Sequence, residues 1–186
     1  MTPRHAVRIR WNESAVRKHC QLSGNQLIIS EAEDTIKGRR LTHSEREALM
    51  ARVGQDSLQK KNKQQLPSKV ELAISMKVMV TTNIETDLDI TNGAHSTIMD
   101  IILHPEEEYQ TDAEEITPVR QPLYLLVKLD WTSTTQLEGL DAHVISVEAI
   151  TQSIQILVLE NDGKTGRCTV KHHQFPVTPA YAFTDY

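Results

Sequence analysis

Large aromatic side chains are scarce in this sequence of 186 residues: they make up 4% of it, while hydrophobic residues as a whole make up 39%. A core must therefore be built from Val, Ile, Leu and Ala with few large anchors, and we expect modest stability. The length fits one domain, or one domain that carries a smaller one inserted in a loop.

Cysteine and long apolar runs are scarce as well. Cys20 and Cys168 lie far apart and belong to no CxxC pair or Cys/His ligand spacing, which argues against a zinc site and a disulfide framework. We therefore expect a reduced, intracellular compartment, cytosolic or nuclear. No apolar run is long enough to span a bilayer, and residues 1–5 are not followed by the apolar stretch of a signal peptide, so no membrane partner is expected.

A surplus of positive charge is also missing, since the formal net charge is -5 and the isoelectric point is near 5.9. Because phosphate binding depends on clustered Lys and Arg, any contact with nucleic acid must come from a local patch. The most basic stretch is expected on a helix from about Pro3 to Leu22 that stops at Gly24. The helix has Val7, Trp11, Ala15 and Leu22 on its apolar side, and its basic residues are Arg4, Arg8, Arg10, Arg17 and Lys18.

Turn and capping signals organise the rest of the chain. Residues 42–45 have the capping-box form and predict a second helix that runs to about Arg52 and ends at Gly54. Residues 55–68 are rich in Gln and Lys, which is typical of a solvated linker. Beyond them the pattern is extended, and five or six short strands suggest a small barrel. The expected strands beyond the linker are 70–82, 96–103, 123–130, 143–150, 154–160 and 167–172, with an irregular acidic excursion at 104–120 and the start of a helix at 177–186. A further short strand is expected before the linker, at 26–30.

The triplet Gly163-Lys164-Thr165 is the nearest approach to a nucleotide-binding loop. Such a loop needs another glycine five residues before Gly163, where this sequence has Val158, and a helix directly after the Lys-Thr pair. Residues 161–164 instead predict a hairpin turn, because Asp-Gly supplies the positive φ angles that such turns need. We therefore expect no catalytic residue and no bound cofactor in this chain.

His172 and His173 are the nearest approach to a metal site. Adjacent residues on a strand point to opposite faces, and no Cys or Asp partner has matching spacing, so solvated or half-buried histidines are expected. Asp130, Glu138 and Asp141 lie in or beside a polar loop without an accompanying nucleophile, and we interpret them as acidic surface.

Three segments are similar, in their order along the chain and in their amino-acid sequence, to one known family. Residues 2–12 resemble the segment that opens the second RecA-like domain of RecD-like, petite-integration-frequency (PIF) type superfamily 1 DNA helicases. Residues 72–83 with 87–93 look like the stretch that enters the family's inserted SH3-like barrel. Residues 174–186 are similar to the run that leads into its Ser-Gln-Gly-Gln motif. The amino-acid sequence of these segments, and of residues 33–38, most resembles that of fungal Helitron-type transposon helicases.

The resemblance implies an α/β fold, with a partial RecA-like helicase domain at 1–54 and 174–186, a linker at 55–68 and an inserted small SH3-like β-barrel at 69–173. It implies a fragment of an ATP-dependent 5′-to-3′ DNA helicase that contributes to the track for single-stranded DNA. In the parent family the ATP-binding loop and its magnesium ion belong to an N-terminal RecA-like domain that is missing here. The chain alone is therefore expected to be inactive.

By family position, the resemblance implies that Thr2, Arg4 and Thr184 contact the DNA backbone through hydroxyl and guanidinium groups. Arg8 joins them on charge alone, one helical turn after Arg4. Each has a plain structural alternative: Thr2 as a helix cap, the two arginines as solvated charges, and Thr184 as a helix-surface hydroxyl.

The chain also departs from the family pattern at two glycines. Ser75 stands where Ile-Gly-Met is expected, and His95-Ser96 stand where Arg-Gly is expected, so easy access to unusual backbone angles is lost. Each change needs a single G-to-A transition, and we hypothesise a decaying transposon copy. The alternative to a motor fragment is a non-catalytic module whose barrel binds a protein or nucleic-acid partner.

Overall fold

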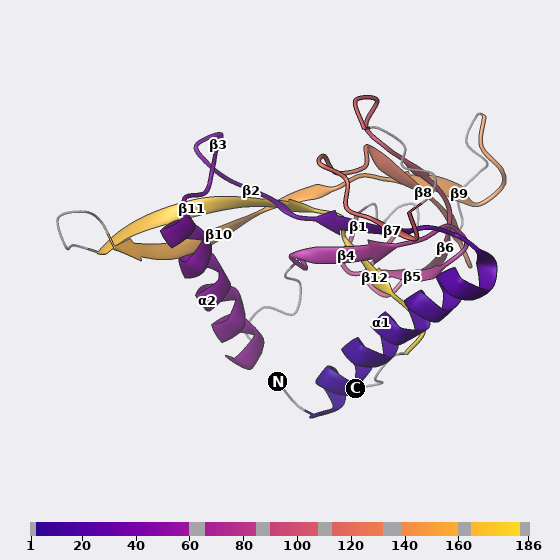
Figure 1. Ribbon diagram of the computed structural model, residues 1–186, viewed down its shortest axis with the longest axis horizontal. Coiled ribbons are helices and arrows are strands. Elements are labelled where there is room, and N and C mark those ends of the chain that lie inside the picture. The colour runs from indigo at the N-terminus through magenta and orange to yellow at the C-terminus, as the bar shows by residue number, and fades with distance from the viewer. Residues whose placement is uncertain are drawn as a thin grey trace.

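The structure is a computed structural model that describes residues 3–59, 66–84, 90–107, 113–131, 139–159 and 165–182. Within these residues the fold is mixed α/β and consists mostly of sheets (Figure 1). The helices are α1 (Pro3–Ser23) and α2 (His43–Gln59). No helix in this part of the chain is long and apolar enough to cross a membrane.

The strands are β1 (Leu27–Glu31), β2 (Glu33–Ile36), β3 (Arg39–Arg40), β4 (Lys69–Leu72), β5 (Lys77–Val80), β6 (His95–Ile102), β7 (Glu115–Ile116), β8 (Tyr124–Leu129), β9 (Val144–Val147), β10 (Ile150–Leu159), β11 (Thr165–Gln174) and β12 (Val177–Pro179). They form three sheets, with the orders β4-β1-β7, β10-β11-β2-β3 and β12-β5-β6-β8-β9. All pairs are antiparallel except β1 with β7.

α1 ends where the sequence predicts. Gly24 has φ +71°, and its N–H donates to the carbonyl oxygen of Cys20 at 2.9 Å, which closes the last turn in the left-handed conformation that glycine tolerates. The predicted apolar side is wrong, because Val7 and Trp11 are 62% and 63% exposed. The helix instead buries Val16, which packs with the main core.

α2 begins with the predicted capping box. Thr42 N–H donates to Glu45 Oε2 at 2.8 Å, and Glu45 N–H donates to Thr42 Oγ1 at 3.4 Å. Arg39 adds a two-pronged ion pair to the same carboxylate, at 2.8 and 2.6 Å. The hydrogen bonds from Arg39 and from the Thr42 backbone lower the pKa of Glu45 to about 2.

The predicted end of α2 at Gly54 is wrong, because the helix continues to Gln59. A glycine inside a helix costs about 1 kcal/mol relative to alanine, which weakens the helix without forcing it to stop. The first five residues of the predicted linker 55–68 are therefore helical. Residues 60–65 lie outside the described part of the chain.

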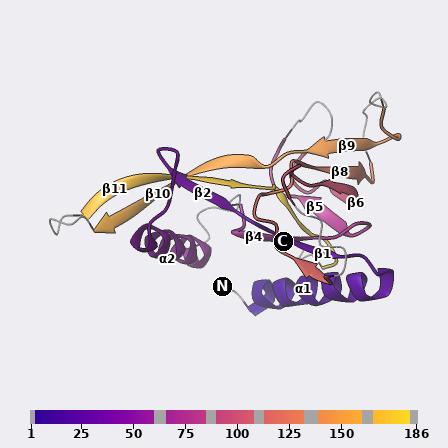
Figure 2. The same ribbon diagram turned by 45° about the horizontal axis from the view of Figure 1, so that its top comes forward.

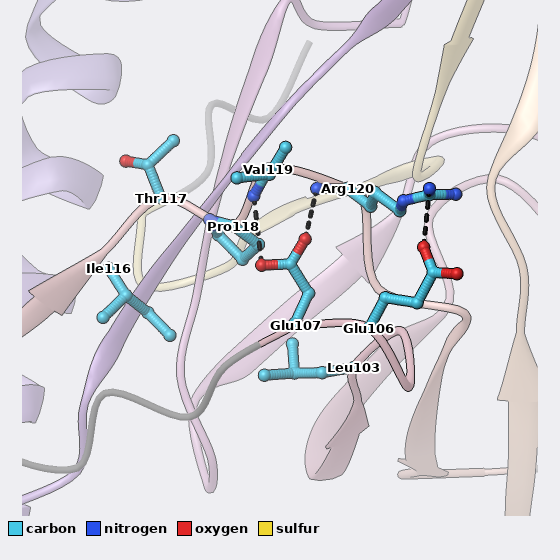
Figure 3. Close-up of a pocket in the computed structure, with 8 residues that line it drawn as sticks. All are labelled: Leu103, Glu106, Glu107, Ile116, Thr117, Pro118, Val119 and Arg120. Atoms are coloured by element: carbon cyan, nitrogen blue, oxygen red, sulfur yellow. Dashed lines mark hydrogen bonds and ion pairs between the residues drawn. The ribbon is translucent and has the colours of Figure 1, made fainter.

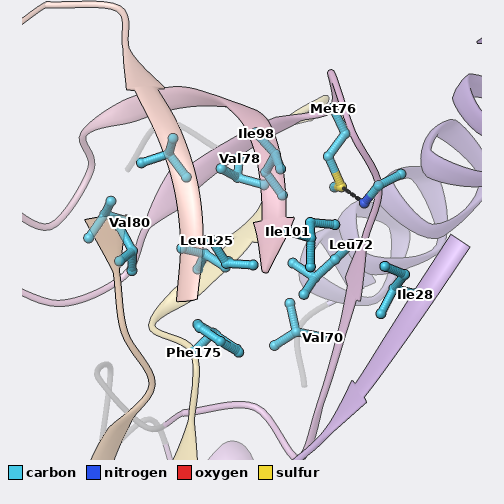
Figure 4. Close-up of a cluster of buried hydrophobic side chains, with 14 of the residues drawn as sticks. Ile28, Val70, Leu72, Met76, Val78, Val80, Ile98, Ile101, Leu125 and Phe175 are labelled. Atoms are coloured by element: carbon cyan, nitrogen blue, oxygen red, sulfur yellow. Dashed lines mark hydrogen bonds between the residues drawn. The ribbon is translucent and has the colours of Figure 1, made fainter. Parts of the chain in front are cut away.

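The main core lies between the sheet of β1 and β4 and the sheet of β5, β6 and β8 (Figure 4). It is aliphatic, as the composition predicts, with Phe175 as its one fully buried aromatic side chain in the described residues. A second, smaller core lies between α2 and the β10–β11 hairpin, which extends from the main body as an arm (Figures 1 and 2). Its buried residues are Ile36, Leu41, Leu49, Ile154, Ile156 and Val170.

The predicted SH3-like barrel at 69–173 is not confirmed. Most of this range is extended, as expected, but no sheet closes into a barrel in the described residues. Its strands instead divide among three sheets, each completed by a strand from outside the range: β1 pairs with β4, β2 with β11, and β12 with β5. Hydrogen bonding therefore joins this range to its flanks.

Two smaller predictions also need correction. Val177 starts a strand and not a helix, because it is buried in the main core and lies opposite Val80 in the β12–β5 ladder. The acidic stretch 104–120 is not wholly irregular, since Glu115 and Ile116 pair in parallel with Leu27 and Ile28 of β1. In both places pairing with a distant strand decides the local structure.

Candidate nucleic-acid interface

Asn12 fastens α1 to the segment that follows β12. Its Nδ2 donates to the carbonyl oxygen of Pro179 at 2.9 Å and to that of Ala182 at 3.4 Å. Its Oδ1 accepts from the backbone N–H of Ala182 at 2.8 Å. Asn12 is 8% exposed, so both ends of a buried amide are satisfied. Two segments from opposite ends of the sequence thus meet at one side chain.

Two further contacts hold α1 against the same part of the fold. The ring Nε2 of His19 lies 3.0 Å from the carbonyl oxygen of Ile74, in the turn before β5. The ring of His19 also lies against that of Tyr181, with centroids 6.2 Å apart. The hydroxyl of Tyr181 accepts from the backbone N–H of Lys77 at 3.4 Å. The orientation of α1 is therefore fixed by polar contacts along its length.

The basic patch expected on α1 is smaller than the sequence suggests. Arg17 donates to Glu115 Oε2 at 2.9 Å and to Glu71 Oε1 at 3.4 Å. The hydrogen bond to Glu115 and the charge of Glu71 raise the pKa of Arg17 above its usual value. Its charge is neutralised within the fold, while Arg10 and Lys18 remain exposed.

Three DNA contacts are implied by the resemblance and a fourth, Arg8, is added on charge alone; the structure describes the side chain of Arg8 and of none of the other three. Arg8 is half-buried, already has an interaction within the chain, and lies one turn before Asn12 on α1. The backbone of Arg4 lies in α1, but its side chain falls outside the described residues. Thr2 and Thr184 also fall outside them, and Thr184 follows Ala182 by two positions in the sequence.

The Gly163-Lys164-Thr165 triplet leads into a strand. Thr165 is the first residue of β11 and pairs with Leu159 of β10, whereas a phosphate-binding loop needs a helix N-terminus at that point. Gly163 and Lys164 themselves lie outside the described residues. The flanking ladder agrees with the predicted hairpin.

The two adjacent histidines have different surroundings, as their alternation on β11 predicts. The prediction that both are solvated or half-buried is wrong for His172, which pairs with an aspartate from the distant strand β2. His172 is buried, and its Nδ1 lies 2.6 Å from Asp34 Oδ1. His173 is partly exposed, and its Nδ1 lies 2.9 Å from Thr151 Oγ1. No group of three metal-ligating side chains occurs among the residues that the structure describes.

A hollow beside β7 is a further feature that could suggest a binding site. Its carboxylates are already used by the loop that forms it (Figure 3). Glu107 accepts from the backbone N–H groups of Val119 and Arg120 at 3.2 and 2.6 Å, and Glu106 pairs with the Arg120 guanidinium at 2.6 Å. These contacts stabilise the loop and account for both carboxylates.

Sequence reasoning did not assign a role to Asn12, although it lies within the segment that carries the family resemblance. The available signal is a polar amide on the same helical face as Val16 and Cys20, at spacings of four and eight residues. An amide on a buried helical face needs partners from another element, but the sequence does not reveal that those partners lie beyond residue 178.

No protein-family model and no curated protein matches the chain. Among solved structures, the chain is similar to the Pif1 helicase from Candida albicans, with 16% identity, a TM-score of 0.49, and coverage of 94% of this chain and 34% of that one. It is also similar to Bacteroides sp Pif1 in complex with ADP-AlF4, with 14% identity, a TM-score of 0.42, and coverage of 85% and 25%. For Bacteroides Pif1 bound to ssDNA the values are 13%, 0.37, 84% and 24%. The chain thus spans 34% or less of each of these structures, and the likeness assigns no role to any of its residues.

Proposed function

We propose that this chain is part of an ATP-dependent 5′-to-3′ DNA helicase of the PIF type and contributes to its track for single-stranded DNA. In this proposal, residues 1–54 and 174–186 belong to a RecA-like motor domain, and residues 69–173 form the β-rich insertion. The nucleotide loop and the magnesium ion belong to another RecA-like domain of the parent protein. The parent acts on DNA in the nucleus.

The contact that supports the proposal most directly is the one between Asn12 and Ala182. The DNA contacts implied by the resemblance come from the two ends of the sequence, and Asn12 joins segments that adjoin both. Arg8 lies one turn before Asn12, and Thr184 lies two positions after Ala182. A track assembled from both ends of the chain requires this proximity.

The chemistry of the proposed track is contact with the DNA backbone. Guanidinium and hydroxyl groups bind phosphate oxygens, which positions a strand without reading its sequence. Because the whole chain has a net charge of -5, we expect the binding to be weak and steeply reduced by salt. Arg17 does not take part, since its charge is neutralised by Glu71 and Glu115.

The test is fluorescence anisotropy with a labelled oligothymidine, titrated at a series of salt concentrations. Each lost phosphate contact lowers the slope of log K against log salt by about 0.7 for a single strand. Arg4→Ala with Arg8→Ala should therefore lower the slope by about 1.4 and weaken binding. The matched control is Lys77→Ala with Lys128→Ala, which removes the same charge from exposed strand positions.

Arg4→Lys with Arg8→Lys retains the charge and should keep most of the binding, which separates charge from folding defects. Circular dichroism melting of each variant checks that it folds. Salt-insensitive binding, or an equal loss in the control pair, would show that these arginines are ordinary solvated charges and would overturn the proposed track.

A further inference from the structure

The three sheets of the described residues leave six strands at their edges, and one of these strands differs from the rest. An edge strand exposes unpaired backbone N–H and C=O groups, which proteins usually protect by short length, charge or proline. Five of the edges are protected in this way. β3 is the pair Arg39–Arg40, β7 has two residues, β9 has four, β12 ends at Pro179, and β4 has four residues that include Lys69 and Glu71.

β10 is the exception. It is ten residues long, and its sequence, Ile-Thr-Gln-Ser-Ile-Gln-Ile-Leu-Val-Leu, contains no charged residue, proline or glycine. Its register with β11 is continuous from Ile150 to Leu159, so no bulge twists the edge away. On its other side it has no strand neighbour in the described part of the chain. Every second residue of β10 therefore turns its backbone N–H and C=O groups towards an open edge.

The two faces of β10 have different surroundings. Ile154 and Ile156 are buried in the smaller core against α2. Ser153, Gln155 and Leu157 alternate with them and are exposed on the outer face, Leu157 by 61%. Figures 1 and 2 show the arm extending from the main body, with α2 beside it. A strand added at the edge would therefore extend one apolar face and one polar face.

From this arrangement we propose that β10 pairs along its open edge with β10 of a second copy of this chain, in an antiparallel ladder about a two-fold axis. Such an interface uses the same surface on both copies, so the strand must be complementary to itself. Pairing about Gln155 meets this condition on both faces. Gln155 lies opposite its own copy, and Ile154 lies opposite Ile156 of the second copy. A primary amide both donates and accepts hydrogen bonds, so two glutamines complement each other.

Charge favours a neutral partner strand such as a second β10. Because β10 has no charged side chain, two copies meet without like-charge contacts where the strands pair. The nearest cations are on β11, where Lys171 lies opposite Ser153 and Arg167 lies opposite Leu157. In the paired sheet Lys171 and Arg167 of the second copy lie three strand spacings apart, about 14 Å, beyond the Debye length of about 8 Å at physiological ionic strength. Their repulsion is therefore largely screened.

The size of the interface predicts a reversible dimer. The ladder pairs residues 151–159 of both copies over about 30 Å, and a sheet is about 10 Å thick, so each copy contributes about 300 Å². This is less than the area of about 800 Å² per partner that standard stable interfaces bury. The dimer should therefore form at high protein concentration and dissociate on dilution.

Sedimentation velocity of the whole chain over a concentration series tests the pairing. The sedimenting species should shift reversibly from the chain mass of 21.1 kDa towards twice that mass. Gln155→Lys places two like charges opposite each other at the centre of the ladder and should abolish the shift. The matched control is Thr169→Lys, because Thr169 lies opposite Gln155 on the same exposed face but on β11, away from the edge. This control should dimerise like the unmodified chain.

Oxidative cross-linking tests the two-fold register. In Gln155→Cys the two introduced thiols lie directly opposite each other, with Cβ atoms about 5 Å apart, and disulfide-linked dimers should form. In Ser153→Cys each introduced thiol lies four residues along the ladder from its copy, about 13 Å, which is too far for a disulfide. Cys20 and Cys168 are present in both variants, so cross-links through them would appear equally.

Circular dichroism melting checks that each variant folds. A shift that survives Gln155→Lys, an equal loss in Thr169→Lys, or equal cross-linking of the two cysteine variants would each overturn the proposal. A chain that stays monomeric across the series would also overturn it and would leave a strand of a different protein as the occupant of the edge. The proposal does not depend on the proposed function, because these variants change no residue of the α1 track.

Discussion

His172 and Asp34 form a largely buried pair that joins β11 to β2, with Nδ1 and Oδ1 2.6 Å apart and side chains 3% and 24% exposed. Burial on its own lowers the pKa of His172. The hydrogen bond and charge of Asp34, with the carbonyl oxygens of Pro67 and Leu66, outweigh burial and raise the pKa above 6.5. The pair therefore stabilises the base of the arm when the ring carries a proton.

Stability should fall as pH rises through the titration of His172. Because its pKa is raised in the folded state, its contribution is fully present below the unfolded value near 6.5 and is lost as pH rises through the folded value. Urea unfolding at one pH below this range and one pH above it measures the difference in the free energy of unfolding. A free energy of unfolding that rises across it would contradict the assignment.

Removing the partner should abolish that dependence. Asp34→Asn should lower the free energy of unfolding by roughly 2 kcal/mol at neutral pH, as expected for a hydrogen bond to a charged group. Glu33→Gln changes the adjacent exposed carboxylate and should cost much less. An equal loss in the free energy of unfolding for the two substitutions would show that the contact between Asp34 and His172 does not stabilise the fold.

Ser75 adopts a conformation that glycine would favour. Its φ is +64°, and its N–H donates to the carbonyl oxygen of Ile98 at 2.8 Å, so the turn is held there by β6. A non-glycine residue in this region costs about 1 kcal/mol or more, and Ser75→Gly should therefore raise the thermal midpoint. Ser14→Gly, in the middle of α1, should lower it instead. A lower thermal midpoint for Ser75→Gly would contradict the inference that the Ser75 backbone is strained.

Ser96 and Ser30 are buried serines with opposite hydrogen-bonding states. Ser96 is 2% exposed and its hydroxyl has no hydrogen-bond partner among the described residues, whereas Ser30 is 1% exposed and its Oγ donates to Gln174 Oε1 at 3.3 Å. An unsatisfied buried hydroxyl costs about 1–3 kcal/mol, so Ser96→Ala should stabilise the chain. Ser30→Ala should destabilise it. Urea unfolding of both variants measures the two changes in stability. A loss of stability in Ser96→Ala would refute the interpretation that the Ser96 hydroxyl is unsatisfied.

Glu45 should support α2 in acid. With a pKa lowered to about 2, its contribution is present above the ordinary value of 4.5 and is lost as pH falls through about 2. Glu45→Ala should cost about 1–2 kcal/mol at neutral pH, because it removes a helix cap and a charge-assisted pair. Glu47→Ala, on the exposed side of the same helix, should change little. Similar losses in both would argue against a special role for the cap.

Local signals predicted several local features, although Gly54 did not end α2. Gly24 ended α1 because its left-handed conformation is set by neighbouring residues, and Thr42 with Glu45 started α2 for the same reason. Asn161 to Lys164 was predicted as a turn, and strands β10 and β11 flank it. These features depend on contacts within a few residues, which a sequence displays directly.

Features decided by distant partners could not be predicted in this way. The pairing of Val177 with Val80 replaced an expected helix by a strand, and α1 buried Val16 in place of Trp11. The partners of Asn12 at Pro179 and Ala182 carry no local signal at all. The proximity of Arg40 and Lys171 could not be predicted either, because the two residues come together only through the register of β2, β3 and β11.

We propose that this chain is a DNA-contacting part of a motor whose nucleotide loop belongs to another domain, and a phosphate-release assay tests this proposal most directly. Phosphoryl transfer needs a backbone cradle, a lysine and a metal, and an arginine finger alone contributes roughly 10³ to 10⁵ in rate. With saturating single-stranded DNA, ATP and magnesium, the purified chain and its Lys164→Ala variant should both release phosphate at the background rate. ATPase activity that co-purifies with the chain and disappears in Lys164→Ala would contradict the claim.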